Sequence, residues 1–450
     1  MLRTLRKSML LILAITTVLV VAACKKEVET VILPDVRGLS LSEAETRTEG
    51  LVVLRSVDVP SHKYLPGYVL GYAIHEPGDT VDQGQRIDVA VVARPLHAFS
   101  HDSRVDYVAK IADTSGPNSP NFDLLIDAGI GGTDLGIPVE YKGQMVLLYG
   151  DSFSGIGSHS GFWFSNFMAL SNNFDLSEGL IMSSVVTNPA GFALPFAQGA
   201  HAQNLWDHES TNPNREVTKI PTGGVTIGDA FYVFYMSVRF WELPGNWFVN
   251  YNQVLKSIDG LKTFTPVESL IWLEDEAPNF GQIMPVNHPE EPGMIYLFAT
   301  PGGRFGGAVL GRVQAANFEN RDAYEYLVAP DTWVKGSVGL EQLLENPYHV
   351  IDAPVAEISV MFNPYLNQWM ALYMETVHMQ TSKTIIMKTA DQIEGPYTDK
   401  VIIMDDDGVP NFYGGFVHPR YTTFDGKKFY IQISRWLPIY QTELFEVVLN

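Results

Sequence analysis

The sequence predicts a mainly β fold, a five-bladed β-propeller preceded by a small α/β module. The last three quarters of the chain consist of short apolar runs separated by turn residues, with few helical periods. Five hairpin-like units recur there, and their first residues lie 88, 72, 63 and 57 positions apart. Repeats at this spacing are typical of propeller blades, whereas a β-sandwich, the alternative, is usually shorter. The units are 134–153, 222–239, 294–313, 357–374 and 414–436.

Length and composition indicate a globular protein of more than one domain. The chain has 450 residues, of which 46% are hydrophobic and 18% charged, so it can bury a large core. Composition shifts and turn clusters mark the expected boundaries. The expected parts are a signal peptide over 1–23, a tether over 24–30, a small module over 31–93, a polar linker over 94–118 and the propeller over 119–450.

The N-terminus has the pattern of a lipoprotein signal. Arg3, Arg6 and Lys7 precede an apolar run over 9–21, and Ala22-Ala23-Cys24 follows. Cys24 is the only cysteine, so a disulfide within the chain is excluded and lipidation of Cys24 is expected. We therefore expect an extracytoplasmic protein held at the cell envelope by a lipid anchor; a transmembrane anchor is the weaker alternative.

Charge and motif content restrict the classes of partner. Removal of the signal leaves 27 basic residues against 51 acidic ones, a formal net charge of −24, which argues against nucleic acid. A neutral or weakly charged substrate such as a polysaccharide suits this surface. No nucleophile elbow, phosphate loop or His/Cys metal spacing is found, so we expect no cofactor and no metal. We also expect a monomer.

The small module shows a short helix between strands. Pro34-Asp35-Val36-Arg37-Gly38-Leu39-Ser40 precedes a helix capped by Ser40 or Ser42, and Gly50 ends it. Pro77-Gly78 precedes a last strand over 87–92. This pattern resembles a PASTA module over its full length. The resemblance implies either peptidoglycan binding or a spacer at the envelope, and both readings stay open for a single module.

The strongest indication of chemistry is one hairpin with an acid at each open end. Asp134 enters its first strand, Asp151 leaves its second, and Lys142-Gly143 forms the turn. Antiparallel pairing therefore places both carboxylates on the same rim of the sheet. Glycoside hydrolysis requires such a pair, one carboxyl protonated and one ionised. The alternative is that both are turn or cap residues, which the hairpin alone favours.

Blade geometry extends the site to other strands. Charged residues at strand ends of different blades are expected around the same rim, where neighbouring charges separate carboxyl pKa values. Glu357 lies in an apolar strand, where a charge is costly to bury without a purpose, so it is the third catalytic candidate. Aromatic residues near these loops suit a carbohydrate cleft or a propeller core. The substrate-binding candidates are Asn166, Arg239, Trp241, Arg304, His418 and Arg435.

Several motifs together resemble the domain-of-unknown-function 4185 family. They are the segments 132–138, 149–153, 165–166, 220–225, 235–239, 302–306 and 357–360, in order along the chain. The resemblance implies a five-bladed propeller and a family that includes bacterial endo-D-arabinanases of cell-envelope arabinan. Asp134 and Asp151 match its paired acids, and Glu357 matches a recurrent strand glutamate. We therefore expect a glycoside hydrolase of an envelope or environmental polysaccharide; the alternative is a non-catalytic carbohydrate-binding or cell-wall-binding lipoprotein.

Overall fold

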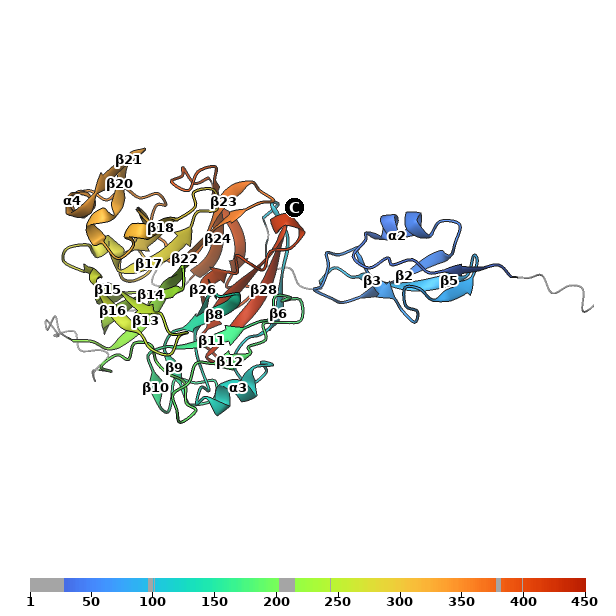
Figure 1. Cartoon of the computed structure of the whole chain (residues 1–450), viewed down its shortest axis with the longest axis horizontal. Coiled ribbons are helices and arrows are strands. Elements are labelled where there is room, and N and C mark those ends of the chain that lie inside the picture. The colour runs from blue at the N-terminus through green and yellow to red at the C-terminus, as the bar shows by residue number, and fades with distance from the viewer. Residues whose placement is uncertain are drawn as a thin grey trace, which may run out of the picture. The chain divides into compact units, whose positions relative to one another are not determined.

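The computed structural model describes residues 28–95, 100, 102–201, 215–242, 244–377, 382–398 and 400–450. The expected signal peptide and Cys24 lie outside these residues. The chain divides into two compact units, Met1–Pro95 and Leu96–Asn450 (Figure 1). Within the described residues, no helix combines the length and the apolar character that a membrane crossing requires.

The first unit is a small α/β module with its own core. Ser40 caps its helix, because the Ser40 side chain accepts from the Glu43 amide while the Glu43 carboxylate accepts from the Ser40 amide. Strand β5 pairs parallel with β2 and antiparallel with β3, and β1 pairs with β4. The elements are β1 (Thr30–Ile32), α2 (Leu41–Thr48), β2 (Val53–Val59), β3 (Val69–Tyr72), β4 (Thr80–Asp82) and β5 (Arg86–Val92).

The second unit is mainly β. Its described residues form five antiparallel sheets of four or five strands, numbered here in chain order. Sheet 1 holds β7 (Leu135–Tyr141), β8 (Gln144–Tyr149), β11 (Phe167–Ser171) and β12 (Ser184–Val185). Sheet 2 holds β13 (Thr218–Ile227), β14 (Ala230–Trp241), β15 (Trp247–Ser257) and β16 (Thr265–Leu273). Sheet 3 holds β17 (Gln282–Asn287), β18 (Met294–Thr300), β19 (Val309–Gln314), β20 (Glu325–Ala329) and β21 (Thr332–Lys335).

Two further sheets and several short elements complete this unit. Sheet 4 holds β22 (Ala356–Asn363), β23 (Gln368–Val377), β24 (Ser382–Ala390) and β25 (Val401–Asp405). Sheet 5 holds β26 (Phe412–Val417), β27 (Lys428–Arg435), β28 (Gln441–Leu449) and β6 (Val105–Asp113). The connections between these strands contain the short pair β9 (Ser152–Phe153) and β10 (Trp163–Phe164), the helices α3 (Phe122–Asp127) and α4 (Gly336–Glu345), and the 3-10 turns at 278–280, 315–317, 321–323 and 424–426.

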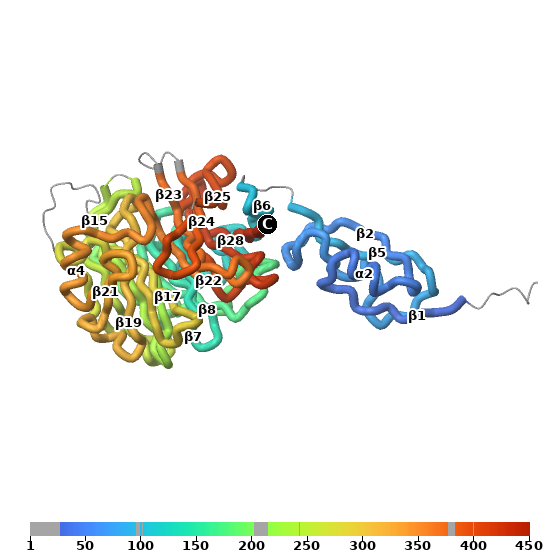
Figure 2. Tube along the Cα trace, turned by 90° about the horizontal axis from the view of Figure 1, so that it is seen from above, coloured from blue at the N-terminus to red at the C-terminus, as the bar shows by residue number. Residues whose placement is uncertain are grey.

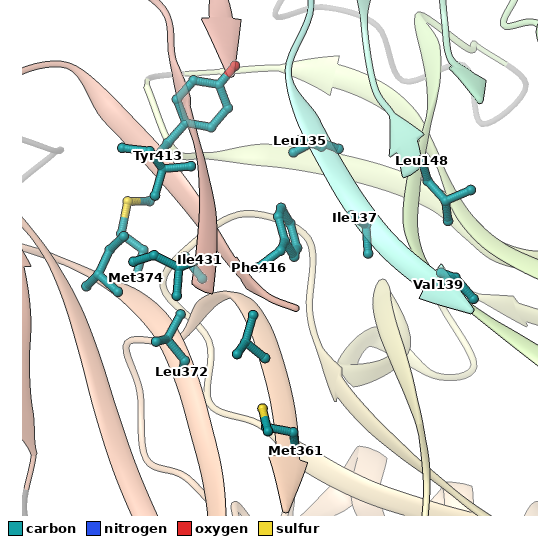
Figure 3. Close-up of a cluster of buried hydrophobic side chains, with 14 of the residues drawn as sticks. Leu135, Ile137, Val139, Leu148, Met361, Leu372, Met374, Tyr413, Phe416 and Ile431 are labelled. Carbon is teal, nitrogen blue, oxygen red and sulfur yellow. The ribbon is translucent and has the colours of Figure 1, made fainter. Parts of the chain in front are cut away.

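The first strands of the five sheets contact one another in chain order. β7 contacts β13, β13 contacts β17, β17 contacts β22, β22 contacts β26, and β26 returns to β7. β17 and β22 lie side by side in Figure 2. Apolar side chains fill the space between these strands, among them Ile137, Met361 and Phe416 (Figure 3). This closed succession of sheets is the arrangement of a β-propeller.

Strand β6 corrects the expected linker over 94–118. Residues 105–113 pair antiparallel with β28, and Tyr107 and Val108 are buried there. The first strand of the second unit therefore pairs with its last strand and completes sheet 5. The stretch reads as polar because it contains Asp106, Lys110 and Asp113 and ends in the turn cluster 113–118, whereas the residues between the first two charges are apolar and buried.

The third expected unit, 294–313, starts one strand too late. It corresponds to β18 and β19, whereas the first strand of sheet 3 is β17. Pro285 lies inside β17, and a proline argues against a strand assignment because it cannot donate to the ladder. The other four units begin within or next to the first strands of their sheets.

Candidate active site

The predicted hairpin is confirmed and places both acids at one rim. β7 pairs antiparallel with β8, with Leu135 opposite Tyr149, so Asp134 and Asp151 flank the open end. The Gly150 amide donates to the Asp134 carbonyl at 3.3 Å. A Cβ at position 150 would lie 2.5 Å from Asp134 Oδ1, so any larger residue there would displace the Asp134 side chain. The motif Tyr-Gly-Asp thus allows the Asp134 side chain to lie directly beside the second strand.

A cavity of about 640 Å³ opens at this rim. It lies where β7, β22, β24 and β26 begin and where β8, β14 and β18 end, so all five sheets contribute to it. Its walls are largely aromatic and apolar, as is usual for ligand pockets. The charged residues at its surface are Asp134, Asp151, Glu242, Arg304, Glu357 and Lys383.

Asp134 is buried next to tyrosines. The Tyr413 hydroxyl donates to Asp134 Oδ2 at 2.8 Å, while Oδ1 is buried and has no hydrogen-bond partner among the described residues. Burial raises the pKa of Asp134 to about 6; the Tyr413 and Tyr440 hydroxyls oppose this shift, and the nearby charge of Glu357 adds to it. Asp134 is therefore mostly ionised at neutral pH, lines the cavity, and has one carboxylate oxygen without a hydrogen-bond partner among the described residues.

Asp151 is held by two donors on one oxygen. Trp163 Nε1 donates to Oδ1 at 2.8 Å, and the Thr218 hydroxyl from sheet 2 donates to the same atom. Removal from water raises the pKa of Asp151 to about 8, Thr218 opposes the shift, and the negative charge of Asp134 increases it. At neutral pH, Asp151 is mostly protonated. The cavity thus contains one acid and one base, separated by environment alone.

Trp163 fixes the orientation of Asp151. Its indole ring stacks on the His201 imidazole with centroids 4.0 Å apart, and Phe153 stacks on it at 5.6 Å. His201 is in turn hydrogen-bonded through Nε2 to the Ser165 hydroxyl at 2.8 Å. Because the indole is held by these rings, its N–H keeps a constant direction toward Asp151.

Arg304 and Glu357 form a buried ion pair across the cavity. Arg304 Nε and Nη2 both donate to Glu357 Oε1, at 2.9 and 2.6 Å. The guanidinium lies over the rings of Trp247 and Tyr413, at 5.3 and 5.0 Å from their centroids. Glu357 has a φ of 22° beside a bulge in the β22–β23 ladder. Such strained backbone is concentrated at functional sites.

The structure places two expected substrate-binding residues away from the cavity. Asn166 is fully buried; its amide donates to the Lys219 carbonyl at 2.9 Å and accepts from the Ala197 amide at 3.1 Å, so it joins sheets 1 and 2. His418 follows the far end of β26, opposite the cavity, and burial lowers its pKa to about 3. His418 was expected at the rim because it lies at a strand end. It lies elsewhere because only the start of a first strand reaches the cavity.

Two expected arginines are also placed elsewhere. Arg239 donates to Glu274 at 2.9 Å and lines a second cavity of about 660 Å³ on sheet 2. Arg435 lies 3.5 Å from the fully buried Glu443 and ties β27 to β28. Neither lines the cavity of Asp134 and Asp151, whereas the predicted Trp241 and Arg304 do.

Sequence reasoning missed four residues that contact the two acids or line their cavity. They are Thr218, Lys383, Tyr413 and Tyr440; Tyr440 donates to the Asp151 carbonyl at 2.8 Å. Lys383 carried only a weak signal, because it stands in the polar stretch 381–384 just before Ile385, Ile386 and Met387. The two tyrosines and the threonine carried none, since such residues are common in any strand.

Replacement of Thr218 by valine tests the environment of Asp151. The Thr218 hydrogen bond lowers the pKa of Asp151, so its loss raises that pKa further above 8. In Thr218→Val, the basic limb of any Asp151-dependent activity should move to higher pH by a measurable fraction of a unit. The matched control is Thr226→Val, whose hydroxyl donates to the Glu140 carbonyl outside the cavity. A basic limb that stays in place would contradict the role of Asp151.

The fold and the site define a mainly β, propeller-like protein with paired carboxylates in a central cavity. The family model described as "Domain of unknown function (DUF4185)" matches residues 119–446, and the chain belongs to this family. No curated protein matches the sequence.

Solved structures are similar to this chain at low sequence identity, and the first of them shares its fold. A candidate hydrolase of Bacteroides ovatus is similar with a TM-score of 0.50 and 12% identity, over 76% of this chain and 90% of that one. An α-L-arabinofuranosidase of Podospora anserina gives 0.41 and 11%, over 78% and 97%. An exo-β-1,3-galactanase of Phanerochaete chrysosporium gives 0.43 and 10%, over 75% and 64%.

Proposed function

We propose that this protein is a glycoside hydrolase whose five sheets are the blades of a five-bladed propeller. The observation that carries the proposal is the pair Asp134 and Asp151, which face one cavity with pKa values of about 6 and about 8. Most glycoside hydrolases cleave the glycosidic bond with one protonated and one ionised carboxyl at the same site.

The two acids take different roles in this reaction. Asp151 gives its proton to the glycosidic oxygen as the bond from that oxygen to C1 breaks. Asp134 acts on the side of C1. It either takes a proton from the water that attacks C1, or it attacks C1 itself before water does. Glu357 adjusts the pair, because its charge raises the pKa of Asp134. Arg304 keeps that charge in place through the ion pair at 2.6 Å.

The proposed substrate is an envelope or environmental polysaccharide, a D-arabinan cleaved internally in the first instance. Support comes from the resemblance of segments 132–138 and 149–153 to a family with endo-D-arabinanases, and from the aromatic walls that Trp241, Trp247 and Trp436 give the cavity.

Assay of the purified protein tests this directly. Incubation with D-arabinan, L-arabinan, xylan and β-1,3-galactan should release new reducing ends from at least one of them, with shortened chains as the early products. A protein that binds one of these glycans and releases no reducing ends would be the non-catalytic carbohydrate-binding protein of the alternative.

We further propose lipidation at Cys24, an extracytoplasmic position at the cell envelope and a monomeric protein. The first unit then acts as a PASTA spacer or peptidoglycan binder; its own core of Leu33, Val36 and Ile87 supports an independent module. Cys24→Ser should release the protein from membranes. Retention of this variant on membranes after a high-salt wash would contradict the anchor.

A further inference from the structure

Glu357 lines the cavity and has one carboxylate oxygen that no described residue satisfies. Both hydrogen bonds from Arg304 end on Oε1, whereas Oε2 is buried without a hydrogen-bond partner among the described residues. A buried, unpaired acceptor is costly unless something outside the chain satisfies it. The strained φ of 22° at Glu357 shows that the backbone departs from regular strand geometry where this side chain is attached.

Lys383 presents the matching donors. Its side chain is 6% exposed and lines the same cavity. Among the described residues, Nζ makes one hydrogen bond, to the Phe412 carbonyl at 3.1 Å, so two of its three N–H groups remain available. Burial lowers the pKa of Lys383 to about 8, and the nearby positive charge of Arg304 acts in the same direction. Core packing alone would not place a second cation here.

We propose that Glu357 and Lys383 form a clamp for hydroxyl groups of one uncharged sugar residue, with Glu357 Oε2 accepting from one hydroxyl and Lys383 Nζ donating to another. This inference rests on the proposed function, because it assigns the recognition half of the same cavity. The Asp134–Asp151 half performs the chemistry, and the clamp holds the sugar ring against it.

The charges around the clamp select against ionic sugars. A carboxylate or sulfate on the sugar would approach Glu357 and Asp134, which the ion pair with Arg304 neutralises only in part. An amino sugar would approach Lys383 and Arg304. A hydroxyl group serves both partners because it donates to the carboxylate and accepts from the ammonium.

Calorimetric binding with oligosaccharides tests the clamp. The full-length Asp151→Asn protein is titrated with oligosaccharides of D-arabinan, L-arabinan, xylan and β-1,3-galactan, and with oligogalacturonate as the acidic probe. At least one uncharged probe should bind, and more tightly than oligogalacturonate. Glu357→Gln and Lys383→Met, added to this background, should each weaken its binding about tenfold or more, the usual loss for a hydrogen bond to a charged group. Lys383→Arg should retain part of the affinity.

The controls separate recognition from folding and from catalysis. Lys262→Met changes an exposed lysine outside the cavity and should bind as the parent does. Glu357→Gln should also reduce the ratio of the affinity for the uncharged probe to the affinity for oligogalacturonate. If the ion pair were merely structural, Glu357→Gln would lower the melting temperature and leave this ratio unchanged. Binding that survives both substitutions, or the absence of binding to every uncharged probe, overturns the clamp. If wild type binds but releases no reducing ends, the hydrolase proposal fails while the clamp stands.

Discussion

Asp151→Asn and Asp134→Asn are each expected to lose at least about 10²-fold in turnover of a confirmed glycan substrate. The amide cannot transfer the proton that each step requires, and proton transfer contributes about 10²- to 10⁴-fold. The loss should appear in kcat, because both variants keep the clamp of Glu357 and Lys383 and the aromatic walls. Initial rates of reducing-end release over a range of substrate concentrations provide the measurement.

The stability of Asp151→Asn distinguishes a catalytic role from a structural one. The folded-state pKa of Asp151, about 8, lies above its unfolded value near 3.8, so its stabilising contribution is complete below the unfolded value and is lost as pH rises through 8. The asparagine side chain cannot ionise, so folding of this variant does not carry the cost of a buried charge at position 151. It should therefore melt at a higher temperature than wild type at pH 9 and lose this advantage at pH 4.

The control for both acids is Asp229→Asn, which changes an exposed aspartate paired with Lys142 at 3.2 Å. It should retain wild-type turnover. Wild-type rates in both Asp134→Asn and Asp151→Asn would remove these two residues from the mechanism, and Glu357 would become the next candidate. A lowered melting temperature with activity reduced only in proportion to folded protein would assign them a structural role.

Lys428→Met is expected to destabilise the second unit by about 3–5 kcal/mol. Lys428 and Glu446 are fully buried and 2.9 Å apart in sheet 5, where β28 also pairs with β6. Removal of the cation leaves the Glu446 carboxylate buried without its ion-pair partner. Chemical denaturation at pH 7, followed by tryptophan fluorescence, measures the loss.

Two further variants show whether this loss comes from the unpaired charge. Lys428→Met combined with Glu446→Leu should recover much of the stability, because apolar replacement of both partners removes the buried charge. Arg420→Met, which breaks the more exposed pair with Glu140, should cost less than about 1 kcal/mol. A small loss in Lys428→Met would show that sheet 5 does not depend on this pair.

The sequence predicted the parts of the site that depend on local geometry. Asp134 and Asp151 lie on one hairpin, 17 positions apart, and strand pairing alone brings them to one rim. Glu357 was found because a charge in an apolar strand is conspicuous, and Arg304 because charged residues at strand ends of different blades were expected at one rim. His418 was misplaced because a strand has two ends, and the sequence does not show which of them faces the cavity.

The remaining contacts depend on the closure of the ring. Thr218 reaches Asp151 from sheet 2, and Tyr413 reaches Asp134 from sheet 5, 279 positions along the chain. Neither residue type is conspicuous, and the pairing of distant strands is not encoded in any local pattern. The same holds for β6, whose partner β28 lies at the other end of the chain.

The pH dependence of kcat/KM for wild type reports on the acid and the base together. If Asp134 and Asp151 are the catalytic pair, the profile is bell-shaped: it rises through about pH 6 as Asp134 ionises and falls through about pH 8 as Asp151 loses its proton. A profile that is flat between pH 5 and 9, or that still rises above pH 9, would contradict this assignment.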